Sequence, residues 1–173
     1  MAWLQPLESA VQDIVVVDRD PSTCKLIVDA LGNPGAAVQC AMTGRSGRRL
    51  LTSKHFDLAI VDVVLPDASG IALAAIAANE NTPVLLILGH PNAIARLKQY
   101  DLLDFPCLLK PLDSVRVCSE AERVMAETRQ NIQRIKDSMA RCQATLAGLE
   151  DVMADSRRLI DVSRRLCGRS DGV

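Results

Sequence analysis

The sequence contains very few aromatic residues: one tryptophan, one tyrosine and two phenylalanines in 173 residues. Because 49% of the residues are nevertheless hydrophobic, the core must be built from valine, leucine, isoleucine and alanine. Such a core favours helices packed on a buried parallel sheet over an all-β sandwich. The length allows one well-buried domain of about 100–150 residues with an extension, but not a second full domain.

The chain also lacks a strong net charge, a long apolar run and a secretory leader. The formal charge of −1 gives no long-range attraction to nucleic acid or to an acidic membrane. The longest apolar runs, such as residues 83–88, fall far short of the roughly 20 residues of a membrane span. We therefore expect a soluble, cytoplasmic protein that makes no membrane contact.

Paired cysteine motifs are missing as well. The six cysteines are scattered without a CxxC pair, which is typical of reduced, mostly buried thiols in a cytoplasmic protein. A thiol switch or an intermolecular disulfide is the alternative interpretation. The cysteines are Cys24, Cys40, Cys107, Cys118, Cys142 and Cys167.

What the sequence does contain, after a short leader at residues 1–11, is an alternation of strand and helix patterns up to about residue 112. The strands are predicted at 13–17, 37–41, 58–61, 84–88 and 107–109. The helices are predicted at 21–31, 44–53, 70–78 and 91–99. This order with short connections predicts a parallel sheet covered by helices on both faces, with ligands at the carboxyl ends of its strands.

The character of the chain changes at Leu112, after which there is no proline and, before Gly168, a single glycine, Gly148. Seam residues recur there at alternating spacings of three and four over about six heptads, which predicts a coiled-coil extension at 119–168 and a disordered tail at 169–173. Gly148 is also a candidate bend, so a continuous helix and a helical hairpin both remain open. The seam residues are Met125, Thr128, Ile132, Ile135, Met139, Cys142, Leu146, Leu149, Met153, Ser156, Ile160, Ser163 and Cys167.

Charged residues follow the ends of three predicted strands. Asp18 and Asp20 come after the first strand, Asp62 after the third and Lys110 after the fifth. Because the carboxyl ends of parallel strands meet at one edge of a sheet, we expect these side chains to converge.

The motifs "DLAIVDVVLPDASG" around Asp62, "TPVLLIL" at the fourth strand and "LLKPLD" around Lys110 make residues 12–118 resemble the receiver domain of two-component response regulators. The resemblance implies a five-stranded, doubly wound, flavodoxin-like α/β fold. It also implies that Asp62 accepts a phosphoryl group from a histidine kinase. Mg²⁺ would be held by Asp18, Asp62 and the backbone carbonyl of Val64, while Lys110 neutralises developing negative charge.

Three positions depart from the family pattern. Arg19 stands where the second acid of the metal-binding pair is expected, and Leu88 stands where a hydroxyl residue ends strand four. Cys107 occupies the aromatic switch position three residues before the lysine. The parts that normally bind the metal and couple phosphorylation to a conformational change are therefore incomplete.

The cation at position 19 suggests a specific hypothesis about the metal site. We expect Arg19 to form an ion pair with Asp62 or Asp18 and to take the place of the metal, so that Mg²⁺ binding is weak or absent. Asp18 and Asp62 would then balance Lys110 and Arg19. Asp20 either turns inward as a replacement ligand or faces solvent.

These features predict an atypical response regulator in a two-component phosphorelay, which is not an enzyme, forms a homodimer through its C-terminal helix and acts on a downstream protein target. One alternative is a haloacid dehalogenase-type phosphatase, with Asp18 as nucleophile and Asp20 as general acid. The other is a phosphorylation-independent receiver with an antiterminator-like, RNA-binding tail. The missing aromatics in the tail argue against nucleic-acid binding. His55 and His90 are predicted to be surface or capping residues.

Overall fold

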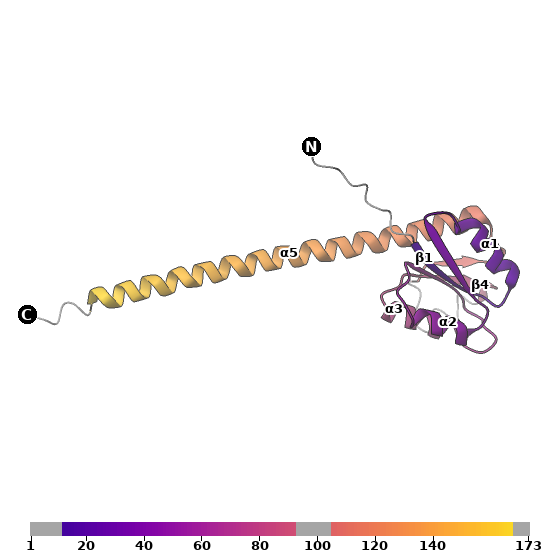
Figure 1. The fold of residues 1–173 in the computed structure, drawn as a ribbon, viewed down its shortest axis with the longest axis horizontal. Helices are drawn as coiled ribbons and strands as arrows, with labels where there is room; N and C mark the ends of the chain where they lie inside the picture. Colours follow the sequence, from indigo (N-terminus) through magenta and orange to yellow (C-terminus); the bar gives the residue numbers. More distant parts are fainter. Residues whose placement is uncertain (1–11, 93–104, 168–173) are drawn as a thin grey trace, which may run out of the picture. The chain divides into compact units, whose positions relative to one another are not determined.

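The structure is a computed structural model that describes residues 12–92 and 105–167. A five-stranded parallel sheet is flanked by helices, as the sequence predicts (Figure 1). The elements, in chain order, are β1 (Gln12–Val17), α1 (Pro21–Leu31), β2 (Ala36–Ala41), α2 (Gly44–Leu51), β3 (Leu58–Asp62), α3 (Gly70–Asn79), β4 (Val84–Leu88), β5 (Cys107–Leu109) and α5 (Ser114–Cys167).

The strands lie in the order β2-β1-β3-β4-β5, which confirms the predicted doubly wound α/β fold. Because β1 and β3 are neighbours in the centre, with Val17 beside Val61, the residues after these two strands emerge side by side. Strand bounds agree with the prediction to within one residue. Helix α2 ends earlier than predicted because Thr52 and Ser53 turn back to cap its last carbonyls. The predicted helix at 91–99 lies, from residue 93 onward, outside the described residues.

The central strands are buried on both faces. Along β1, Val15 and Val17 pack with α2 and α3, whereas Ile14 and Val16 pack with α1 and the start of α5. This division follows from the two-residue period of a strand, which sends successive side chains to opposite faces. A run of consecutive valines is therefore stable only between two helical layers.

Helix α5 is continuous through Gly148, which selects the continuous helix over the hairpin. The chain divides into two compact units, Met1–Thr128 and Arg129–Val173. The first unit extends past the predicted boundary at residue 118 because apolar residues of the first turns of α5 are buried against the sheet. These residues are Val117, Ala121, Val124 and Met125. Among the described helices, none has both the length and the apolar composition that crossing a membrane requires.

Candidate functional site

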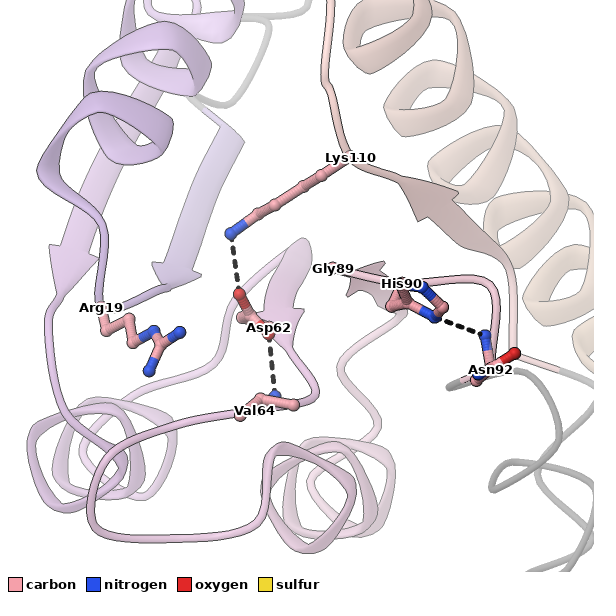
Figure 2. A pocket seen from close by; sticks show the side chains of 7 residues that line it. All are labelled: Arg19, Asp62, Val64, Gly89, His90, Asn92 and Lys110. Atoms are coloured by element: carbon pink, nitrogen blue, oxygen red, sulfur yellow. Dashed lines mark hydrogen bonds and ion pairs between the residues drawn. The ribbon is translucent and has the colours of Figure 1, made fainter.

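A pocket of about 670 Å³ opens at the carboxyl edge of the sheet, where the residues after β1, β3, β4 and β5 meet. Figure 2 shows the side chains reaching it from four separate segments of the chain. The pocket therefore forms where the topology brings strand ends together. Its lining residues are Arg19, Asp62, Val64, Gly89, His90, Asn92 and Lys110.

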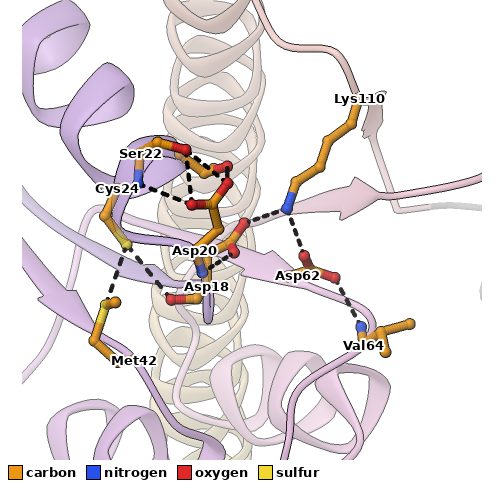
Figure 3. Close-up of polar contacts among 9 residues, drawn as sticks. Asp18, Asp20, Ser22, Cys24, Met42, Asp62, Val64 and Lys110 are labelled. Atoms are coloured by element: carbon orange, nitrogen blue, oxygen red, sulfur yellow. Dashed lines mark hydrogen bonds and ion pairs between the residues drawn. The ribbon is translucent and has the colours of Figure 1, made fainter.

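Lys110 joins the two predicted site aspartates. Its Nζ donates one hydrogen bond to Oδ2 of Asp18 and one to Oδ2 of Asp62, each at 2.8 Å (Figure 3). Asp18 is fully buried and Asp62 is 4% exposed, whereas a quarter of the Lys110 side chain reaches solvent. The structure thus brings together three of the four charged residues that the sequence analysis placed at this edge, all but Asp20, and it holds them as an ion-paired triad.

The electrostatics of the triad follow from burial and pairing. Burial raises the pKa of the Asp18 carboxyl above its ordinary value, although the hydrogen bonds from Lys110 and from the Asp20 backbone act in the opposite direction. For Lys110, burial is the largest influence and lowers the pKa, but the hydrogen bonds to Asp18 and Asp62 outweigh it and the pKa is raised. The lysine is therefore strongly held in its charged form.

Backbone amides fix the remaining oxygens of both carboxylates. Oδ1 of Asp18 accepts a hydrogen bond from the N–H of Asp20, and Oδ1 of Asp62 accepts one from the N–H of Val64, each at 2.8 Å. Every carboxylate oxygen of the two aspartates thus has a protein donor. This network sets the orientation of both side chains without any other ligand.

Asp20 has a local structural task. As the N-cap of α1, its carboxylate accepts hydrogen bonds from the Ser22 N–H at 3.0 Å and from the Ser22 hydroxyl (Figure 3). It also accepts one from the Thr23 hydroxyl. These bonds lower the pKa of Asp20. Capping of this kind is what an aspartate just before a Pro-initiated helix is suited for. The Asp20 carboxylate is therefore engaged at the start of α1, and its role as a replacement metal ligand remains a prediction.

The structure does not contain the predicted ion pair of Arg19. Arg19 is exposed and lines the pocket (Figure 2), but within the described residues Asp18 and Asp62 both form their ion pairs with Lys110. The physical reason is position: the buried carboxylates face the strand end that carries Lys110, whereas Arg19 is the next residue after Asp18 and its side chain leaves on the solvent side. Replacement of the metal by Arg19 remains a prediction.

The two switch positions have different environments. Leu88 is buried in the face of the sheet that packs on α2 and α3, and its carbonyl accepts a hydrogen bond from the N–H of Lys110 at 2.8 Å. Cys107 is exposed at the start of β5. Neither side chain offers a hydroxyl or an aromatic ring to the pocket, and their roles in switching stay predictions.

The sequence analysis did not identify several residues that shape the site. Gly70 begins α3 so close to β3 that a Cβ at this position would lie 1.9 Å from the carbonyl oxygen of Asp62.

Asp67 accepts hydrogen bonds from the backbone N–H groups of Gly44 and Arg45, which ties the loop after β3 to the start of α2. Only the glycine in "DASG" was a usable signal, because the partners of Asp67 are far away in sequence. His90, which the sequence analysis predicted to be a surface or capping residue, is exposed and accepts a hydrogen bond from the Asn92 N–H; its place in the pocket lining was not foreseen.

The donor set does not suit a firmly held Mg²⁺. In the described part of the chain, no group of three or more histidine, cysteine, aspartate or glutamate side chains is arranged to hold a metal ion. Asp18 and Asp62 are the two buried acids, and the Lys110 ammonium lies 2.8 Å from both. Hard divalent cations need several oxygen ligands, and here Arg19, which lines the pocket, stands where the family has a further acid. The side chains present thus offer Mg²⁺ fewer oxygen ligands than the family pattern does.

Comparisons with known proteins identify the family to which this fold belongs. The family model of the response regulator receiver domain matches residues 14–122. The transcriptional regulatory protein ZraR of Salmonella typhimurium is 35% identical over 123 residues, which cover 68% of this chain and 27% of that protein. The response regulator PilR of Pseudomonas aeruginosa is 29% identical over 108 residues, covering 61% of this chain and 24% of PilR. The chain thus spans about a quarter of the length of these curated relatives.

Solved structures share the fold. A CheY-like receiver domain from Methanospirillum hungatei JF-1 aligns with a TM-score of 0.64 and 19% identity, covering 70% of this chain and 99% of that one. NtrX from Brucella abortus aligns with a TM-score of 0.65 and 22% identity, covering 73% and 29%. With the family model matching more than half of the chain, this protein belongs to the response regulator receiver domain family of two-component signalling.

Proposed function

We propose that this chain is an atypical receiver, in which Asp62 is a weak phosphoacceptor and output proceeds through homodimerisation and contacts with a downstream protein. The observation that carries the proposal is the exposed Arg19 in the pocket lining, because it stands where the family has the second metal-binding acid and leaves Asp18 and Asp62 as the buried acids of the described residues. Receiver domains are typically phosphorylated by histidine kinases and generally bind Mg²⁺ at the phosphorylation site. Here Arg19 stands in place of one acid and Asp20 caps α1, so that metal site has few carboxylate ligands.

Phosphorylation of Asp62 would be a transfer between two nucleophiles. A carboxylate oxygen of Asp62 forms a bond to phosphorus as the bond from phosphorus to a kinase histidine nitrogen breaks. Catalysis of such a transfer is mostly positioning and neutralisation of negative charge. Lys110 supplies one positive charge, but Leu88 cannot donate a hydrogen bond to the transferred group. We therefore expect Asp62 to be modified slowly and incompletely.

Output through the C-terminal helix is supported by the composition of its surface. Large apolar residues of the second unit, such as Ile135 and Met139, are exposed, and contiguous apolar surface of this kind usually marks an interaction site. The usual coupling, in which a hydroxyl and an aromatic ring move together, lacks both parts at Leu88 and Cys107. Pairing of the helix in a homodimer is then the remaining route from the receiver to a partner protein.

The dehalogenase-type alternative has less support. It requires Asp20 as a general acid, but the hydrogen bonds from Ser22 and Thr23 lower the pKa of this carboxyl and keep it ionised at neutral pH. A carboxylate held as the anion cannot donate a proton to a leaving group.

The decisive experiment is incubation of the protein with acetyl phosphate, with and without Mg²⁺, followed by intact-mass measurement. We expect a small phosphorylated fraction that Asp62→Asn abolishes. The matched variant Arg19→Asp restores the second acid and should increase both Mg²⁺ binding, followed by NMR at Asp62, and the yield of phosphoprotein. Rapid, complete and tightly Mg²⁺-dependent phosphorylation of the unmodified chain would contradict the proposal.

A further inference from the structure

The second unit presents a stripe of large apolar side chains along one face of α5. Each of them is roughly half exposed or more, from 45% for Ile132 to 60% for Leu146. A helix in water does not keep such a stripe without a partner, because its burial is the main source of helix stability beyond the intrinsic propensities. The stripe consists of Ile132, Ile135, Met139, Leu146, Met153 and Ile160.

The spacing of the stripe indicates what covers it. The seam keeps alternating steps of three and four residues from Thr128 to Cys167, so it stays on one face only if the helix supercoils with a partner of the same period. A globular surface or a short peptide would cover only a few turns of this seam. A second copy of the same helix matches all of them.

We propose that two copies of α5 pair in parallel and in register along this stripe. This inference rests on the proposed homodimer and adds the direction of its two helices. In such a pair each seam residue meets its own counterpart, so that Ile132 packs on Ile132 and Ile135 on Ile135. Both receiver units are then attached at the same end of the paired helices.

The hydroxyl residues of the seam decide the direction. In the parallel pair, Thr128 faces Thr128 and Ser156 faces Ser156, so each hydroxyl can find a hydrogen-bond partner in the same layer. The antiparallel alignment that covers the seam most evenly instead places Ser156 against Ile132 and Thr128 against Ile160. The Ser156 hydroxyl buried against Ile132 loses its bonds to water, and Ile132 loses an apolar neighbour. The Thr128 hydroxyl keeps its hydrogen bond to the Val124 carbonyl at 2.9 Å, so at that layer the loss is the apolar neighbour of Ile160.

The charges beside the seam do not reverse this choice. The same antiparallel alignment brings Arg129 opposite Arg157, which is unfavourable, and Lys136 opposite Glu150, which is favourable. These contributions have opposite signs and are screened near the surface. The matching of polar and apolar layers is therefore the deciding contribution, and it favours the parallel pair.

Disulfide trapping in the full-length chain tests the direction. On a background carrying Cys142→Ser and Cys167→Ser, which removes both native thiols of the seam, we introduce Ile135→Cys and oxidise with copper phenanthroline. A parallel pair should give at least about tenfold more covalent dimer than the control Arg134→Cys, because only seam positions bring two identical Cβ atoms within disulfide range. The background protein without an added cysteine reports any contribution from Cys40 or Cys107.

Mixtures of variants distinguish an antiparallel pair of helices from the absence of a dimer. If Ile135→Cys alone gives no more covalent dimer than the control, but its mixture with Met153→Cys gives much more, the helices pair antiparallel and our inference is wrong while the homodimer stands. Light scattering on the same samples measures the mass independently. A monomeric mass contradicts the homodimer itself, and a mass above that of a dimer contradicts a two-helix pair.

Discussion

The sheet of the receiver unit and the second half of α5 are both rich in aliphatic residues, but they bury them differently. Val16 and Ile60 are at most 1% exposed, whereas Ile135 and Met139 are close to 60% exposed. The strands send alternate side chains to two faces that helices of the same chain cover. In the part of the chain that the structure describes, the large apolar residues of the second unit stay exposed on one face of the helix. The receiver unit therefore buries its apolar residues within itself, whereas those of the extension would be buried only in the homodimer that we propose.

The strongest test of this contrast introduces an aspartate into each region. Val16→Asp should lower the free energy of unfolding by at least about 4–5 kcal/mol, because it places an unpaired charge between two apolar layers. Ile135→Asp should leave the hydrogen-exchange protection of the sheet unchanged while it reduces the dimer population. Equal loss of sheet protection in both variants would show that the two regions are not independent.

A smaller loss in the free energy of unfolding is expected at the site, where charges rather than apolar groups are buried. Lys110→Met leaves Asp18 and Asp62 without their shared cation and should cost about 2–3 kcal/mol, below the range for fully buried pairs because the lysine is partly solvated. Urea unfolding followed by circular dichroism measures this loss. The control Lys25→Met removes the exposed pair with Asp29 and should change little. A comparable loss in the control would refute a special role for the triad.

The raised pKa of Lys110 also predicts the direction of a pH effect. Because the folded state holds this proton more tightly than the unfolded state, the stabilisation is complete below the ordinary lysine value of 10.5 and is lost as the pH rises through the folded pKa. Cys24, whose pKa burial raises to about 12, adds a loss in the same direction. Urea unfolding between neutral and alkaline pH should therefore show a steeper decline in the unmodified chain than in Lys110→Met. Parallel curves would contradict this assignment.

The smallest loss of stability is expected from a substitution at the start of α1. Asp20→Ala removes the N-cap and should lower the melting temperature by a few degrees at most, whereas Asp20→Asn keeps a capping oxygen and should stay close to the unmodified chain. Amide exchange at Ser22 reports the loss of the cap locally. If Asp20→Ala instead abolished Mg²⁺ binding, Asp20 would be a ligand and not only a cap.

The outcome at the site shows where sequence reasoning reaches its limit. The convergence of Asp18, Asp62 and Lys110 was predictable, because each follows a strand and parallel strands end at one edge of the sheet. The ion pair of Arg19 was not formed, because the side-chain directions of two neighbouring residues differ and the chain order does not reveal them. Gly70 shows the same limit, since its close approach to the Asp62 carbonyl exists only once α3 packs against the end of β3.

The sequence by itself determined the order of strands and helices, the strand bounds and the continuous seam, because hydrophobic periodicity acts over a few neighbouring residues. Only the tertiary structure decided which cation pairs with the buried aspartates and that Val117 to Met125 belong to the receiver core. These two outcomes depend on atoms that are distant along the chain and come into contact after folding. At that range, burial and hydrogen-bond geometry decide between charges that look equivalent in the sequence.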